Sequence, residues 1–118
     1  MMRDQILDDL VNRLKKFADE RDWEQFHSPK NLAMALSVEV AEILELFQWL
    51  TEEQTKNISP DKIEKVKEEI GDVQIYLVRL ADQFGIDPLQ AAEDKIKKNE
   101  LKYPVNKSKG SAKKYTEL

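Results

Sequence analysis

Two pairs of acidic residues interrupt apolar stretches of this chain, and each pair has its members three positions apart. Glu39 and Glu42 form the first pair, and Glu69 and Asp72 form the second pair after a gap of 26 residues. On a helix, residues at this spacing lie on one face about one turn apart. The residues four positions from Glu39 and Glu42 are all apolar, whereas Lys65 precedes Glu69 by four positions. The first pair therefore has no cation of its own helix to offset its charge.

Four carboxylates in apolar surroundings are costly to bury unless a positive charge lies among them. A set of oxygen ligands suits a hard divalent cation, so Mg²⁺ is predicted, with Mn²⁺ as an alternative. A di-iron site would need Glu-x-x-His pairs, and His27 is the only histidine. Because Mg²⁺ commonly binds substrate phosphates as well, a nucleotide is the expected substrate class. A solvated acidic surface is the alternative interpretation of the two pairs.

The two acids of a pair share one face only if they lie on a helix. The sequence predicts four helices, at 4–20, 29–50, 60–84 and 88–103. Apolar residues recur at three- and four-residue steps in the first and third of these segments. A capping residue followed by proline precedes each of the last three helices, at Ser28, Ser59 and Asp87. Gly85 is the expected stop of the third helix, and residues 51–59 are expected to form a loop. No strand pattern is present, so the predicted fold class is all-α.

Length and composition limit the possible functions. A chain of 118 residues predicts one domain, which we place at residues 1–104, followed by a basic and flexible C-terminal tail at 105–118. The net charge of −4 argues against general nucleic-acid binding, and the absence of cysteine excludes disulfides and thiolate metal sites. No segment has the length and apolarity of a signal peptide or membrane span, so a cytoplasmic location is expected.

The second and third predicted helices are apolar over more than the one stripe that a monomeric surface helix needs. We therefore expect a homo-oligomer, a dimer or a tetramer, in which the four-helix bundle is completed by other copies. The alternative is a monomer in which the other two helices cover the whole apolar surface.

Several other residues could contact a nucleotide. Trp23 with His27, and Trp49 at the end of the second helix, could stack on a base or bind its edge, although aromatic residues at helix ends are also common in cores. No Gly-rich phosphate-binding loop is present. Lys95 and Asn99 share one helix face and could bind phosphates, or they could belong to a solvated basic stripe. Gly71 lies between Glu69 and Asp72, which suggests close packing by a neighbouring helix or a phosphate.

The combined pattern resembles the all-α MazG-like nucleotide pyrophosphohydrolases, and in particular their dCTP pyrophosphatase branch. Beyond the two acid pairs, the resemblance covers nearly the whole chain. The similar segments are Arg21-Asp22-Trp23-Glu24-Gln25-Phe26-His27 with Pro29 and Asn31, Glu45-Leu46-Phe47-Gln48-Trp49, Lys95 with Asn99 and Tyr103-Pro104, and Lys114-Tyr115-Thr116-Glu117-Leu118. The chain departs from close animal relatives in having Leu14 where they have a histidine of the base pocket.

The resemblance implies an enzyme that cleaves a deoxynucleoside triphosphate between its α- and β-phosphates, with dCTP or related cytosine nucleotides favoured, as house-cleaning of the nucleotide pool. The four acids match the metal ligands and the catalytic centre. The implied substrate-binding residues are Trp23, His27, Asn31, Trp49, Tyr76, Lys95 and Asn99. Water is expected to attack the α-phosphorus, with Glu39 and Glu45 as alternative general bases. The same chemistry on dUTP, dATP or a damaged nucleotide is one alternative, and a non-catalytic helical oligomerisation module is another.

Overall fold

A computed structural model describes residues 2–118 of the chain, and within that range it contains helices and no strand. The elements in chain order are α1 (Met2–Glu20), η1 (Glu24–Phe26), α2 (Pro29–Phe47), α3 (Glu52–Thr55), α4 (Pro60–Gln83), α5 (Pro88–Lys102), α6 (Val105–Ser108) and η2 (Tyr115–Glu117). The four long helices are those expected from the sequence, so the all-α prediction is confirmed. The chain forms two compact units, one up to Gly85 and the other from Ile86 onward.

The helix starts follow from local hydrogen bonds that the sequence predicts. The hydroxyl of Ser28 accepts a hydrogen bond from the backbone N–H of Asn31 at 3.2 Å, and Ser59 caps α4 in the same way. At the start of α5, the carboxylate of Asp87 accepts hydrogen bonds from the backbone N–H groups of Leu89 and Gln90, at 2.8 and 3.1 Å. Each such cap satisfies a backbone donor that has no partner within the helix, which stabilises the helix by about 1 kcal/mol. Gly85, two positions after the last residue of α4, has a φ of +64°, a conformation that glycine adopts without the strain of a side chain.

The predicted loop at 51–59 was wrong in part, because it contains the short helix α3. The backbone N–H of Thr51 donates to the side chain of Gln54 at 2.9 Å, and the backbone N–H of Gln54 donates to the Thr51 hydroxyl at 3.2 Å. This reciprocal pair is a capping box, which favours a helical turn even in a polar segment. Thr at the cap with Gln three positions later was the overlooked signal. Helix α2 also ends at Phe47, three residues before the expected end.

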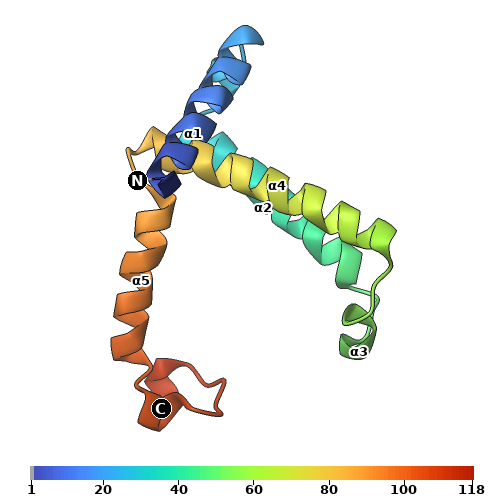
Figure 1. The fold of residues 1–118 in the computed structure, drawn as a ribbon, viewed down its shortest axis with the longest axis vertical. Coiled ribbons are helices and arrows are strands. Elements are labelled where there is room, and N and C mark those ends of the chain that lie inside the picture. The colour runs from blue at the N-terminus through green and yellow to red at the C-terminus, as the bar shows by residue number, and fades with distance from the viewer. Residues whose placement is uncertain (1) are drawn as a thin grey trace. The chain divides into compact units, whose positions relative to one another are not determined.

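The first unit is organised around α2 and α4, which run antiparallel and side by side, with α1 packed on α4 (Figure 1). Its buried hydrophobic residues come from these three helices. They are Ala18, Leu32, Val78 and Ala81. Lys15 of α1 also forms an ion pair with Asp82 of α4 at 3.4 Å. This small core holds the two acid-bearing helices against each other.

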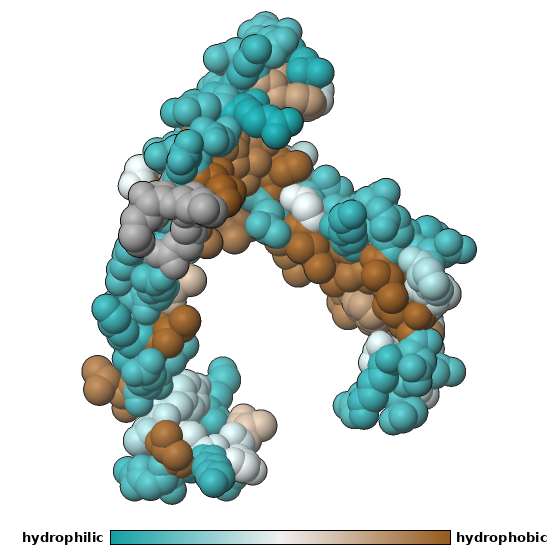
Figure 2. Space-filling model, in the orientation of Figure 1, coloured by the Kyte–Doolittle hydropathy of each residue, from teal (hydrophilic) through white to brown (hydrophobic). Residues whose placement is uncertain are grey.

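A large part of the apolar surface of α2 and α4 stays exposed in a single chain. Hydrophobic residues gather along these two helices in the space-filling view (Figure 2). On α2, Val38, Val40 and Leu44 are at least half exposed, and on α4 Ile63 and Ile70 are also exposed. The excess of apolar surface inferred from the sequence is therefore present in the structure.

The second unit consists of α5 and the segment that follows it. The rings of Tyr103 and Tyr115 meet edge to face with centroids 6.0 Å apart, and the ammonium of Lys102 lies 4.8 Å from the centre of the Tyr115 ring. These contacts hold η2 beside the end of α5. The boundary at residue 104 and the flexibility of the tail remain predictions. None of the helices described here combines the length and apolarity that crossing a membrane requires.

Candidate active site

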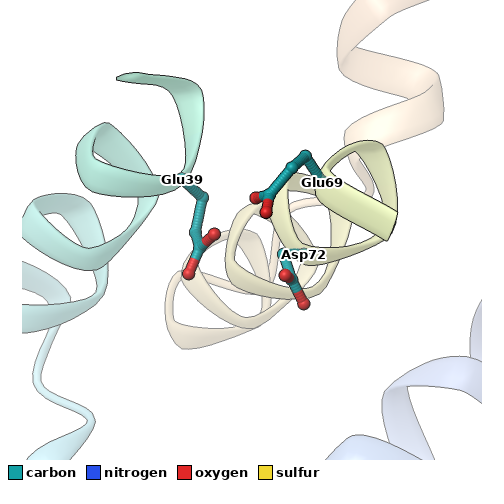
Figure 3. Close-up of side chains that lie close together, drawn as sticks. All are labelled: Glu39, Glu69 and Asp72. Carbon is teal, nitrogen blue, oxygen red and sulfur yellow. The ribbon is translucent and has the colours of Figure 1, made fainter. Parts of the chain in front are cut away.

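Three of the four predicted acids converge between α2 and α4. Glu39 extends from α2 toward α4, which carries Glu69 and Asp72 (Figure 3). One carboxylate oxygen of each residue lies within 4.8 Å of the others. The Oε2 atoms of Glu39 and Glu69 are buried and accept no hydrogen bond from the described residues. This arrangement, which we call the acid cluster, leaves negative oxygens facing one another without a donor between them.

Glu42 lies beside the acid cluster and is half-buried. Its carboxyl group approaches both Glu39 and Glu69 closely enough to raise the pKa of each. Lys65 forms no ion pair with Glu69 among the residues described, so that possible neutralising partner is not used. All four predicted acids thus contribute to one concentration of negative charge.

The electrostatics of the acid cluster favour a bound cation or proton. Burial raises the pKa of Glu39 from its ordinary value of 4.5 to about 7, and the neighbouring acids add to that rise. Burial and then Glu42 raise the pKa of Glu69. Two carboxyl groups that approach each other can share a hydrogen bond only when one of them is protonated. A divalent cation with oxygen ligands removes the same repulsion, so the donor set fits Mg²⁺ or Mn²⁺.

A cavity of about 220 Å³ adjoins the acid cluster. Glu39 and Asp72 belong to its lining as well as to the cluster. Its other walls are mainly aromatic and apolar, and include Leu14, Trp23 and Tyr76. A ligand in this pocket therefore meets both flat aromatic rings and carboxylates. Ligand pockets usually measure about 300–1,000 Å³, so this cavity suits one part of a nucleotide better than a whole one.

The segment between α1 and α2 positions the aromatic wall. Asp22 adopts a positive φ of 55°, and the chain then turns so that the backbone N–H of Trp23 bonds to the carbonyl of Ala18 at 2.9 Å. The Trp23 ring meets the Phe17 ring at 5.6 Å and the His27 ring at 6.4 Å, edge to face in both cases. Such pairs fix ring orientation as well as burying surface. Trp23, His27 and Tyr76, which the resemblance placed at the substrate, thus line one pocket.

Sequence reasoning missed Arg79, which also lines the pocket. It is 3% exposed, and its Nη2 lies 3.3 Å from Oε1 of Glu24 and 3.1 Å from Nδ1 of His27. Its Nε–H has no acceptor among the described residues. A signal was present, because Arg79 interrupts the apolar run at 77–81 and follows Asp72 by seven positions, on the same helix face.

Of the remaining predicted substrate residues, Asn31 and Trp49 belong to the first unit but not to the lining of this pocket. The side-chain amide of Asn31 donates to the backbone carbonyl of Phe26 at 3.1 Å, and so stabilises the turn before α2. Trp49 follows the end of α2 and is 86% exposed. Lys95 and Asn99 are exposed on α5, in the second unit. The charge of Lys102 close by lowers the pKa of Lys95.

No helix of the described chain packs closely on Gly71, and the approach of a phosphate to this residue stays a prediction. A Cβ atom at this position would have no other atom within 4 Å. The position is therefore open, and the absence of a side chain leaves the surface beside Glu69 and Asp72 unobstructed.

The comparisons of sequence and the comparison of structure with known proteins point to the same family. The model of the MazG-like family matches residues 34–118. The dCTP pyrophosphatase 1 of Bos taurus is 46% identical over 114 residues, which are 95% of this chain and 68% of the relative. The human dCTP pyrophosphatase 1 is 44% identical, with 95% and 67% covered. A crystal structure of a pyrophosphatase from Archaeoglobus fulgidus is 44% identical, with a TM-score of 0.68 over 82% of this chain and 91% of that chain.

Proposed function

Because this chain belongs to the MazG-like family, we propose that it is a nucleoside triphosphate pyrophosphohydrolase that converts dNTPs to dNMPs and pyrophosphate. The relatives named dCTP pyrophosphatase 1 support dCTP or a related cytosine nucleotide as the favoured substrate. One observation carries the proposal. Glu39 and Asp72 belong both to the acid cluster and to the aromatic pocket, so the pocket would hold a base or sugar with the phosphates near the acids.

The acids would hold a divalent cation, Mg²⁺ or Mn²⁺. The support is the pair of buried, unpartnered oxygens of Glu39 and Glu69 and the all-oxygen composition of the set. Such a cation, when bound, neutralises negative charge on phosphate oxygens during hydrolysis. Glu42 approaches two members of the cluster and would complete the set.

The chain's own residues supply binding, orientation and proton transfer. Trp23 and Tyr76 offer ring faces and edges for the base and sugar, and they keep water from the apolar side of the pocket. Of the two candidate general bases, Glu39 lines the pocket, whereas Glu45 is exposed on α2. A carboxylate that lines the pocket can reach a water beside the bound ligand, which is the geometry that a general base requires. We assign this role to Glu39.

Lys95 and Asn99 would bind the phosphates, and Asn31 and Trp49 would complete the base and sugar site, as the resemblance implies. The support for Lys95 is its nearness to Lys102, because two cations that repel each other favour an anion between them. The small cavity also supports further contributions from outside the pocket described here.

The exposed apolar face of α2 and α4 would pack against a second copy of the chain, in a dimer or tetramer. Apolar surface of this kind is normally covered in the functional assembly. The cytoplasmic location expected from the sequence stays a prediction.

The same chemistry on dUTP, dATP or a damaged nucleotide is a second candidate. The apolar side chain of Leu14 lines the pocket and has no hydrogen-bonding group with which to read a base edge. This feature favours a broader choice of base than a polar side chain at the same place would allow.

The test is a panel of deoxynucleoside triphosphates, including dCTP, dUTP, dATP and oxidised or methylated bases, incubated with Mg²⁺. The products are identified by ³¹P NMR. The proposal predicts monophosphate and pyrophosphate in equal amounts, with the highest kcat/KM for a cytosine nucleotide. The proposal would be refuted if the products were a nucleoside diphosphate and orthophosphate. It would also be refuted if the wild type hydrolysed no member of the panel. Glu39→Gln should abolish turnover, whereas Glu68→Gln, an exposed acid on α4, should not change it.

A further inference from the structure

The buried guanidinium of Arg79 contacts the His27 ring at Nδ1. This contact determines whether Nδ1 carries a proton. Nη2 of Arg79 lies 3.1 Å from Nδ1 of His27. A guanidinium has only N–H donors and stays protonated in proteins. A hydrogen bond at this distance therefore requires a lone pair on Nδ1. A neutral imidazole that accepts at Nδ1 carries its proton on Nε2.

Protonated His27 is disfavoured by the same geometry. An imidazolium would point an Nδ1–H at the N–H of Arg79, so two donors and two positive charges would face each other. Burial lowers the pKa of His27, and the charge of Arg79 lowers it further, against a smaller opposing effect of Glu24. Both effects favour the neutral ring over the imidazolium.

Glu24 makes this arrangement possible. Its carboxylate lies 3.3 Å from the same Nη2, and its side chain is 49% exposed while that of Arg79 is 4% exposed. A buried arginine without a counter-charge would be strongly destabilising. Glu24 begins η1 and His27 directly follows it, so one short segment presents both partners to α4.

We propose that Arg79 is a positioning residue that holds His27 as the Nε2–H tautomer, and thereby gives the pocket one fixed hydrogen-bond donor. This proposal rests on the proposed function for the identity of the ligand. Nε2 has no hydrogen-bond partner among the described residues, and His27 lines the pocket. The group that it meets must be an acceptor, such as a carbonyl oxygen or an unprotonated ring nitrogen of a base. A ligand that presents an N–H to this edge would leave two donors opposed.

The tautomer can be measured without any ligand, because His27 is the only histidine in the chain. Two-dimensional ¹H–¹⁵N correlation spectra of ¹⁵N-histidine-labelled protein at about pH 8, above the ordinary pKa of histidine, distinguish the two ring nitrogens. We expect a protonated-type nitrogen at Nε2 and an unprotonated-type nitrogen at Nδ1 in the wild type. A wild-type spectrum with the proton on Nδ1, or with both tautomers populated, would overturn the proposal.

Variants of Arg79 distinguish a residue that positions His27 from one that only stabilises the fold. Arg79→Met removes the donor at similar length and should leave a mixture of tautomers, whereas Arg79→Lys retains a cationic donor and should restore Nε2–H. If Arg79→Met leaves the two tautomers about equally populated, only about half of the molecules present the Nε2–H donor, so the KM for the preferred nucleotide should rise about twofold with kcat little changed. Arg13→Met, which removes an exposed arginine of α1, is the matched control and should alter neither the tautomer nor the KM.

The outcomes for this proposal and for the proposed function are distinct. A folded Arg79→Met variant that keeps the pure Nε2–H tautomer would refute the role of Arg79, whatever the enzyme hydrolyses. If Arg79→Met does not fold, the wild-type spectrum still tests the proposal, because a proton on Nδ1 or a mixture of tautomers in that spectrum would refute the role of Arg79. A protein with the expected tautomer that hydrolyses no nucleotide would refute the proposed function and leave the assignment of Arg79 intact.

Discussion

Replacing Glu39 by glutamine measures the repulsion stored in the acid cluster. Glutamine has the shape of the protonated acid but carries no charge at any pH. The pKa of Glu39 is raised to about 7, so the folded protein binds its proton more tightly than the unfolded chain does. Between about pH 4.5 and 7 the unfolded state therefore binds fewer protons, and the free energy of unfolding of the metal-free protein falls as the pH rises.

The size of this effect follows from the pKa. A rise from 4.5 to about 7 corresponds to about 3 kcal/mol when each factor of ten is worth 1.36 kcal/mol. Because the side chain is only half-buried, solvent screening reduces this to about 1–2 kcal/mol. Without metal and above pH 7, Glu39→Gln should thus be more stable than the wild type by that amount. The difference corresponds to roughly 5–15 °C in Tm for a small domain, and it should vanish near pH 4.5.

A divalent cation should reverse the order of stability. Mn²⁺ at one hundred times its Kd would stabilise the wild type by about 2.7 kcal/mol, whereas the variant has lost a ligand and should gain little. Thermal unfolding with and without Mn²⁺ at about pH 8, above the pKa of Glu39, gives both numbers. Glu68→Gln, which removes an exposed acid of α4, is the control and should behave as the wild type does. If metal-free Glu39→Gln is less stable than the wild type, or gains as much from Mn²⁺, the acid cluster does not act as argued.

The other predictions concern the core, a helix cap, the metal and the phosphates. Leu32 is 1% exposed, so Leu32→Ala should lower the free energy of unfolding in urea by about 2–5 kcal/mol, whereas the same change at half-exposed Met34 should cost far less to the folded monomer. Ser59→Ala removes the cap of α4 and should lower that free energy by about 1 kcal/mol, which chemical denaturation measures. Chelation with EDTA should abolish pyrophosphate release, and added Mg²⁺ should restore it; activity that survives chelation contradicts the role of the acid cluster. Lys95→Met should raise the KM for the triphosphate about tenfold or more, the factor for one hydrogen bond to a charged group, and an unchanged KM would remove Lys95 from the phosphate site.

The sequence by itself determined where the long helices begin and which acids share one helix face. Ser28, Ser59 and Asp87 fix the helix starts through hydrogen bonds to residues two or three positions away, and such local contacts need no knowledge of the fold. The spacing of Glu69 and Asp72 likewise places both on one face of α4 wherever that helix packs. The capping box of Thr51 and Gln54 was equally local, so α3 was readable although it was overlooked.

Only the tertiary structure decided which residues meet across the chain. Glu39 reaches Glu69 and Asp72 because of the register in which α2 packs on α4, and packing of apolar side chains that are far apart in sequence sets that register. The contact of Arg79 with Glu24 and His27 spans more than fifty positions, and no helix rule predicts it. For the same reason, the exposed position of Trp49 could not be inferred from its residue type and spacing. Periodicity specifies the face on which a side chain lies, but its partners depend on how whole helices pack.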